Sequence, residues 1–252
     1  MSAPLRDRLR AGEATVGTFL NLGSPLAAEA CALAGFDWLL VDLEHGAGGE
    51  DALVGQLLAA AAHDVSVIVR VETAERIRAG RVLDAGAAGV MFPRLDTQEE
   101  VVDALAHLRY PPEGDRGVAT YNRACGFGLR TGVLDTANDE VIAVVQIESV
   151  AALDNVEAIA QAPGVDVLFV GPRDLTHALG VPGQIDAREY RAALDRVVAA
   201  ARSAGVTAGV LASDRQAAEG YLDAGFGFVA VGSDSSFIAT AAWAAVRPLV
   251  AT

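Results

Sequence analysis

The sequence contains no lysine, because all 19 of its Lys+Arg residues are arginine. Enzymes that form a Schiff base with a carbonyl substrate, or that hold pyridoxal phosphate, need a lysine amine, and so does a Walker-type phosphate loop. The sequence therefore excludes all three. Any carbonyl chemistry must be driven by another group, and a metal ion is the obvious replacement.

Cysteine, positive charge and long apolar runs are also scarce. The two cysteines, Cys31 and Cys125, are too few for a disulfide framework, which is typical of a reducing compartment. A formal net charge of −14 argues against nucleic acid as a partner. No run approaches the roughly 20 apolar residues of a membrane span. Since the first ten residues also lack a signal-peptide pattern, we expect a cytoplasmic protein without a membrane partner.

The chain repeats a pattern of apolar, β-branched runs, each followed by a helical segment. Eight such units, preceded by an amphipathic helix within residues 1–14, predict a parallel sheet closed into one (β/α)8 barrel domain over residues 1–252. An open doubly wound sheet is the alternative, weakened because no strand is followed by G-x-G-x-x-G. The runs lie at residues 16–20, 38–45, 65–71, 89–95, 141–148, 165–174, 206–211 and 226–233.

Local signals mark several helices and connections. Thr97 with Glu100 has the pattern of a capping box at a helix start. The last helix is expected from residue 234 to about 246, ending before Pro248. Residues 109–140 break the strand–helix rhythm. A long connection without secondary structure in a compact domain is usually a lid or an insertion, so we expect one of these here.

Polar side chains gather where the apolar runs stop, which is where barrel enzymes carry their chemistry. Glu148 ends the fifth run and Asp174 the sixth, so parallel pairing predicts two carboxylates at one mouth, where a hard divalent cation can bind. Arg70 ends the third run and predicts either an anion site or a structural ion pair. His45 is the histidine best placed for chemistry, beside two acids, Asp42 and Glu44, and before a glycine loop. A helix cap or a structural ion pair remains an alternative for Asp42, and a structural ion pair for Glu148.

At these residues the sequence resembles the HpcH/HpaI family of metal-dependent pyruvate aldolases over nearly the whole chain. The resemblance implies reversible cleavage of a 4-hydroxy-2-oxo acid to pyruvate and an aldehyde, through a metal-stabilised enolate. Citramalyl- or malyl-CoA lyases and macrophomate synthase share this ground plan and are the alternatives. The matching segments are G-T-F-L-N-L-G-S-P (17–25), V-D-L-E-H-G (41–46), V-R-V (69–71), L-D-A-G-A-A-G-V-M-F-P (83–93), Q-I-E-S (146–149) and G-P-R-D-L (171–175).

The same resemblance implies the metal and 2-oxo acid site. Glu148 and Asp174 match the two ligands of Mg²⁺ or Mn²⁺, with Co²⁺ or Zn²⁺ also possible. Arg70 matches the arginine that binds the ketone and enolate, and Gln146 a glutamine that contacts pyruvate. Further substrate contacts are expected from Gly171, Pro172, Arg173 and Leu211.

The remaining implied roles concern proton transfer and assembly. His45 with Asp42 matches the acid/base pair. Asp84 matches a residue that reaches a neighbouring subunit's site, and Arg123 resembles one that lines the aldehyde side. The resemblance also implies a C-terminal helix around Trp243 that packs on a neighbouring subunit, in a homo-hexamer built as a trimer of dimers.

Overall fold

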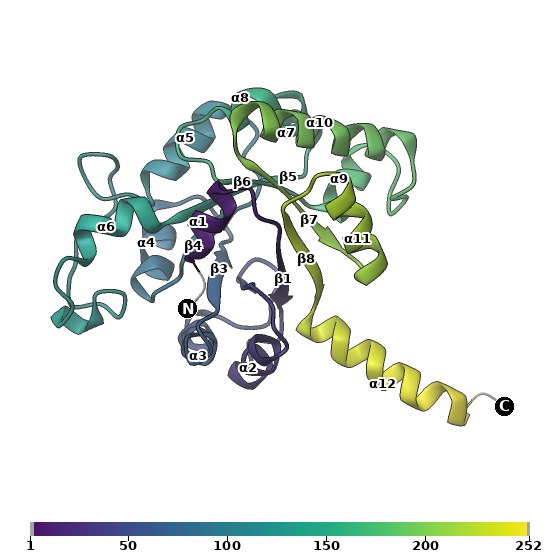
Figure 1. Ribbon diagram of the computed structural model, residues 1–252, viewed down its shortest axis with the longest axis horizontal. Coiled ribbons are helices and arrows are strands. Elements are labelled where there is room, and N and C mark those ends of the chain that lie inside the picture. The colour runs from purple at the N-terminus through teal and green to yellow at the C-terminus, as the bar shows by residue number, and fades with distance from the viewer. Residues whose placement is uncertain (1–2, 251–252) are drawn as a thin grey trace.

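Eight parallel strands, β1 to β8 in chain order, form a closed barrel, and β8 pairs with β1 to complete it. Helices cover the outside of this barrel (Figure 1). The computed structural model describes residues 3–250, so residues 1–2 and 251–252 of the expected domain lie outside the described part. The predicted (β/α)8 barrel is confirmed and the open sheet is wrong. The strands are β1 (Thr15–Leu20), β2 (Trp38–Asp42), β3 (Ser66–Arg70), β4 (Gly89–Phe92), β5 (Ile142–Ile147), β6 (Val167–Val170), β7 (Thr207–Ala212) and β8 (Phe228–Ser233).

The helices begin at side chains that cap them in several places. Thr97 accepts a hydrogen bond from the Glu100 backbone while Glu100 reaches back to Thr97, so the predicted capping box is confirmed. The helices are α1 (Leu5–Arg10), α2 (Pro25–Leu33), α3 (Glu50–Ala61), α4 (Arg76–Asp84), α5 (Gln98–Ala106), the 3₁₀ turn η1 (Gly126–Gly128), α6 (Val133–Glu140), α7 (Val150–Asp154), α8 (Val156–Ala160), α9 (Pro172–Ala178), α10 (Arg188–Ala204), α11 (Arg215–Asp223) and α12 (Asp234–Val250).

Apolar side chains form two layers, one inside the barrel and one between the strands and the outer helices. Successive residues of a strand point to opposite faces of the sheet. In β3, Ile68 therefore packs inside the barrel, whereas Val67 and Val69 pack outward against the helices. Burial on both faces explains why the strands read as continuous apolar runs in the sequence.

Helix α1 closes the end of the barrel at which the strands begin. Leu5 and Leu9 pack on the apolar cluster inside the barrel. Arg6 holds the helix in place through an ion pair with Asp166, which directly precedes β6, at an Nε–Oδ1 distance of 2.9 Å. The carboxyl ends of the strands, where the polar residues gather, lie at the opposite end.

Two segments differ from the expectation. The connection at 109–140 contains η1 and α6, which together extend from the side of the barrel (Figure 1), so it is not without secondary structure. Helix α12 continues through Pro248 to Val250. A proline this close to a helix end removes one of only a few remaining backbone hydrogen bonds, so the cost of continuing is small. No helix between residues 3 and 250 is long and apolar enough to cross a membrane.

Candidate active site

Strand alternation places a layer of polar side chains at the carboxyl end of the barrel interior. In β2, Trp38 and Leu40 belong to the apolar cluster inside the barrel, so Asp42, two residues further on, also points inward. The same period of two applies to the strands on either side. The inward-facing polar layer consists of Asn21, Asp42, Arg70, Gln146 and Glu148.

Asp42 and Arg70 form a buried, two-pronged ion pair at the centre of this layer. The distances are 2.9 Å from Nε to Oδ1 and 2.7 Å from Nη2 to Oδ2. Asp42 Oδ1 also accepts hydrogen bonds from the backbone N–H groups of Glu44 and His45, at 3.1 and 3.2 Å. Asn21 donates to Asp42 Oδ2 at 3.2 Å. The carboxylate is thus saturated, and it holds Arg70 in one orientation.

The third nitrogen of the guanidinium, Nη1, is directed at other site residues. It lies 3.4 Å from Gln146 Oε1 and 3.3 Å from Glu44 Oε2. Burial lowers the pKa of Arg70, but the hydrogen bonds and charge of Asp42, with Glu44 and Glu148, outweigh burial and raise it above the ordinary value. Arg70 is therefore a permanent cation with one nitrogen directed towards this group, as an anion site requires.

Glu148 follows β5 and is fixed through both carboxylate oxygens. The Arg94 backbone N–H donates to Oε1 at 3.0 Å, and Gln146 Nε2 donates to Oε2. Burial raises the pKa of Glu148 to about 7, and the negative charges of Asp174 and Glu44 add to the increase. Glu148 is thus a carboxylate that needs a positive partner near neutral pH.

Gly171, Pro172, Arg173 and Asp174 form the turn from β6 into α9. Asp174 does not end a strand as the sequence pattern suggested, because α9 begins at Pro172 and places Asp174 in its first turn. Arg173 and Asp174 are both exposed. A Cβ on Gly171 would come within 2.7 Å of Gln146 Nε2, so only glycine lets this turn approach the Gln146–Glu148 pair.

His45 lies at the edge of the site, on the loop that follows β2. Its side chain is 66% exposed, and its Nε2 is 3.9 Å from Glu44 Oε2. Asp42 contacts the backbone of His45 and not its ring, so the expected acid/base pair is joined only through the main chain. Glu44, which the sequence analysis did not assign, is the carboxylate that faces the ring. Its position between Asp42 and His45 was the available signal.

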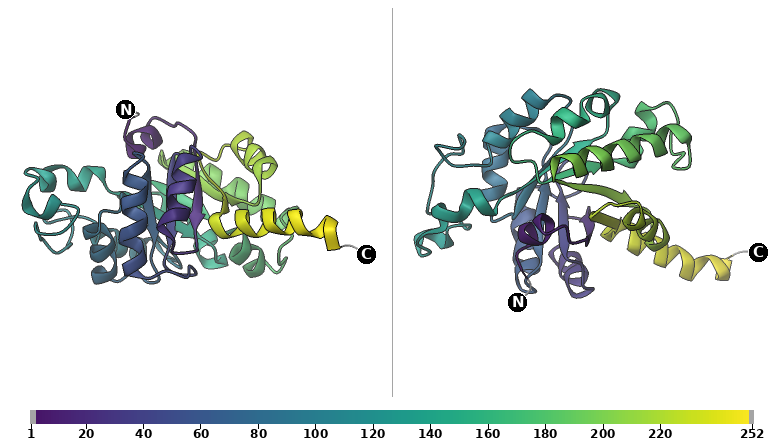
Figure 2. Two further views of the ribbon diagram at one scale, coloured as in Figure 1. Left: turned by 90° about the horizontal axis from the view of Figure 1, so that it is seen from below. Right: turned by 45° about the horizontal axis from the view of Figure 1, so that its top comes forward.

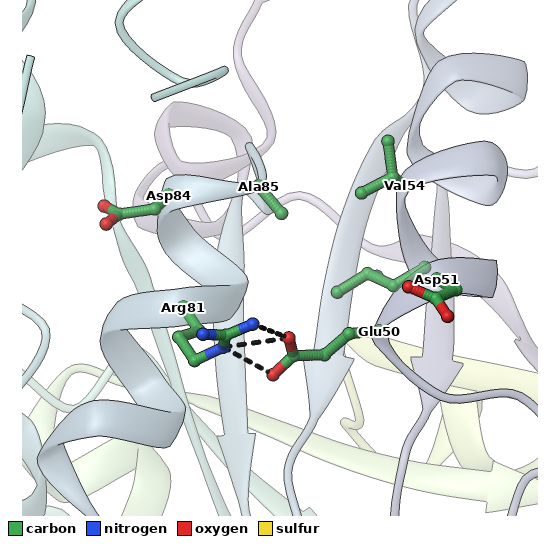
Figure 3. A pocket seen from close by; sticks show the side chains of 7 residues that line it. Glu50, Asp51, Val54, Arg81, Asp84 and Ala85 are labelled. Atoms are coloured by element: carbon green, nitrogen blue, oxygen red, sulfur yellow. Dashed lines mark hydrogen bonds and ion pairs between the residues drawn. The ribbon is translucent and has the colours of Figure 1, made fainter. Parts of the chain in front are cut away.

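Asp84 and Arg123 lie together, but in the outer ring of helices. Asp84 ends α4 and pairs with Arg116 at 2.8 Å, while Arg123 Nη1 donates to the carbonyl of Ala85 at 2.7 Å. None of the interactions found within residues 3–250 joins them to the polar layer of the barrel. Asp84 instead lines a surface pocket of about 520 Å³ between α3 and α4 (Figure 3), where Arg81 forms ion pairs with Glu50. Leu211, on β7, packs against the apolar cluster inside the barrel.

The carboxylates of the polar layer suit a divalent cation. Glu44 Oε2 is buried beside Arg70 Nη1, at 3.3 Å, and it adds negative charge near Glu148. Among residues 3–250, no three or more His, Cys, Asp or Glu side chains are grouped as a complete metal cage. Glu148 and Asp174 would supply two protein ligands, which is how Mg²⁺ is usually held, with waters and substrate as the others.

Residues 15–241 match the HpcH/HpaI aldolase/citrate lyase family. The chain belongs to this family.

Named relatives agree with this assignment. The hydroxypyruvate/pyruvate aldolase of Paraburkholderia phytofirmans is 45% identical to this chain over 237 residues. The match covers 92% of this chain and 91% of the relative. A 5-keto-4-deoxy-D-glucarate aldolase of Klebsiella pneumoniae is 41% identical over 226 residues, covering 90% and 88%. The crystal structure of a family protein from Burkholderia cenocepacia has a TM-score of 0.93 and 42% identity, covering 97% of this chain and 98% of that chain. Aldolases are carbon–carbon lyases, and this member of the family is an enzyme of that class.

Proposed function

We propose that the enzyme cleaves 4-hydroxy-2-oxo acids reversibly to pyruvate and an aldehyde, with a divalent cation held by Glu148 and Asp174. The observation that carries the proposal is the meeting of negative charge at Glu148, whose pKa is raised to about 7 by burial, Asp174 and Glu44. Mg²⁺ or Mn²⁺ suits this all-oxygen site, with Co²⁺ or Zn²⁺ as substitutes. When bound, the cation would act as a Lewis acid and stabilise negative charge on the oxo acid.

Arg70 and Gln146 bind the 2-oxo acid in this proposal. Arg70 Nη1 is the guanidinium nitrogen that Asp42 leaves free, and it is directed towards Gln146 and Glu44. Because Asp42 holds the guanidinium in place before the substrate arrives, the donor need not reorganise as charge develops on the keto oxygen. Gly171, which approaches Gln146, is a further substrate contact in this proposal, together with Pro172, Arg173 and Leu211.

His45 moves the proton. Cleavage breaks the C3–C4 bond: His45 takes the proton of the C4 hydroxyl, the C4 oxygen becomes the aldehyde carbonyl, and the bond's electron pair passes to the enolate. Protonation of C3 then gives pyruvate. The exposed ring suits this role because the departing aldehyde lies on the solvent side, and an imidazole can both accept and return a proton.

A homo-oligomer completes the proposal, with a trimer of dimers as the expected form. Asp84 and Arg123 lie in the outer layer, where a neighbouring subunit's site can meet them. Helix α12 extends away from the barrel in every view (Figure 1 and Figure 2). Its Ile238, Trp243 and Leu249 are 59%, 60% and 82% exposed, and such an apolar surface favours a protein partner. We infer a single-domain cytoplasmic enzyme.

The test is pyruvate release from a panel of 4-hydroxy-2-oxo acids, followed with a coupled dehydrogenase. Protein stripped with a chelator should be inactive and should recover when Mn²⁺ or Mg²⁺ is added. Glu148→Gln and Asp174→Asn should remain inactive at the same metal concentration. Full activity in the stripped protein, or in either variant, would refute the proposed role of the metal. Hydroxypyruvate should be tried beside pyruvate in the reverse direction, because the Paraburkholderia relative is named for both.

A further inference from the structure

We propose that Asn21 is a positioning residue of the active site, which aims the Arg70 guanidinium by holding the Asp42 carboxylate. The inference rests on the proposed function, in which Arg70 binds the 2-oxo acid. Asn21 follows the last residue of β1 and faces the barrel interior by the two-residue period that also places Phe19 there.

The backbone around Asn21 is clamped from the opposite end of the chain. Asp234, which begins α12 and is 3% exposed, accepts hydrogen bonds from the backbone N–H groups of Asn21 at 2.7 Å and Leu22 at 3.2 Å. The same carboxylate accepts from the Ser235 backbone at 2.7 Å. Asn21 is therefore held by a buried side chain more than 200 residues away in sequence, and its Cα position is not free to adjust.

The side-chain amide has only one possible orientation towards Asp42. Asn21 Nδ2 lies 3.2 Å from Asp42 Oδ2, the oxygen that also receives Arg70 Nη2 at 2.7 Å. An ionised carboxylate only accepts hydrogen bonds, so the amide nitrogen must face it. The other atom, Asn21 Oδ1, is buried and has no hydrogen-bond partner among the residues described. A buried acceptor without a partner costs stability, which is typical of a residue kept for a site rather than for packing.

The main chain of Asn21 also holds the loop that carries His45. The Ala47 N–H donates to the Asn21 carbonyl at 2.7 Å, which anchors the segment that follows β2. Glu44 and His45 lie in this segment, and their own N–H groups bond to Asp42. Asn21 thus contacts Asp42 through its side chain and the His45 loop through its backbone. Substituting the Asn21 side chain removes the contact to Asp42 and leaves the backbone contact to the His45 loop in place, so the two contributions can be separated.

The experiment measures binding of oxalate, a planar dianion that mimics the enolate of pyruvate, to the Mn²⁺-loaded enzyme by calorimetry. Asn21→Ala should weaken oxalate binding by about tenfold, the effect of one hydrogen bond to a charged partner. Its affinity for Mn²⁺ alone should stay within about twofold, because Asn21 touches neither Glu148 nor Asp174. Asn21→Asp keeps the size of the side chain but places a second carboxylate against Asp42, so it should bind oxalate no better than Asn21→Ala.

Asn138→Ala is the matched control, because this asparagine also makes side-chain bonds, to both backbone groups of Tyr110, far from the site. It should lower the melting temperature but leave oxalate affinity unchanged. A packing role for Asn21 predicts near wild-type binding in Asn21→Asp, and that result would overturn the inference, as would wild-type binding in Asn21→Ala. If the wild-type enzyme binds no oxalate and releases no pyruvate, the proposed function fails and this inference fails with it.

Discussion

Asp42 and Arg70 lie opposite each other in the register of β2 and β3, and both carboxylate oxygens of Asp42 bind the guanidinium. The Asp42 side chain is fully buried and that of Arg70 is 10% exposed. The pair therefore has two effects. Each charge offsets the free-energy cost of burying the other. The pair also determines which guanidinium nitrogen faces the substrate.

We expect Asp42→Ala to reduce both stability and activity. Removing one partner leaves Arg70 buried without a counter-charge, which costs about 3–5 kcal/mol of unfolding free energy. Urea titration measures the change. Glu157→Ala is the control, because Glu157 pairs with Arg196 at 2.8 Å on the surface, with a half-exposed side chain. That variant should lose less than about 1 kcal/mol. Equal losses in the two variants would contradict the structural role given to Asp42.

Glu148→Gln should stabilise the metal-free protein at high pH and not at low pH. The folded-state pKa of about 7 lies above the ordinary value of 4.5, so this group contributes stability that is present below pH 4.5 and is lost as pH rises through 7. A neutral glutamine avoids that loss. In a chelator, the variant should exceed the wild type by about 1–3 kcal/mol at pH 8 and match it near pH 4.

Added Mn²⁺ should reverse the order at pH 8, because the cation stabilises only the protein with the ionised ligand. Melting temperatures measured with and without metal at both pH values test this. A wild-type protein that is not stabilised by Mn²⁺ at pH 8 would count against the metal site. A difference between the two proteins that does not change with pH would count against the raised pKa.

Gly171→Ala should abolish most activity while leaving the fold intact. Its φ of −88° is accessible to alanine, but the new Cβ would meet Gln146 Nε2 at 2.7 Å and Glu148 Oε2 at 3.4 Å. We expect kcat/KM to fall by about two orders of magnitude, the usual cost of displacing a positioned group by roughly 1 Å. Gly220→Ala is the control, because a Cβ there meets nothing within 4 Å and lies within α11. It should leave activity unchanged and stabilise the protein slightly.

Trp243→Glu should break the proposed oligomer. A charge at this position of α12 cannot be buried against a neighbouring subunit without a large desolvation cost. Light scattering after gel filtration should show a smaller species than the wild type. Val102→Glu on α5 is the control, since Val102 is 45% exposed but lies on another face. If both variants keep the wild-type mass, α12 is not part of the interface.

The alternation of eight apolar runs with helical segments was enough to predict the barrel and the end of it at which polar residues gather. Strands that are buried on both faces consist of unbroken apolar residues. The first polar residue after each run therefore marks the carboxyl end of the strand, where the site lies. The runs could not show which acid would bind Arg70, because that choice depends on how β2 and β3 are staggered. The anion site and the ion pair were therefore both open from the sequence, and in the structure Arg70 forms the ion pair with Asp42 while its Nη1 is directed at Gln146 and Glu44.

Asp174 illustrates a different limit. Its apolar run appeared to continue to residue 174, but the chain turns at Gly171 and starts α9 with Pro172. A proline in the first helical turn was the signal that could have found this boundary. Asn21 and Glu44 were given no role for another reason. Asn21 matters through its contact to Asp42, and Glu44 through its contact to Arg70, and neither contact exists before the strands are brought together.

Apolar side chains fill the barrel interior and α1 covers the end at which the strands begin, so reactants must reach the polar layer from the carboxyl end of the strands. Reactants and products must share a single entrance, with Arg70 at depth and His45 at the rim. In the direction of synthesis, the oxo acid must therefore bind before the aldehyde. In the direction of cleavage, the aldehyde should leave first and pyruvate last, so product release should be ordered.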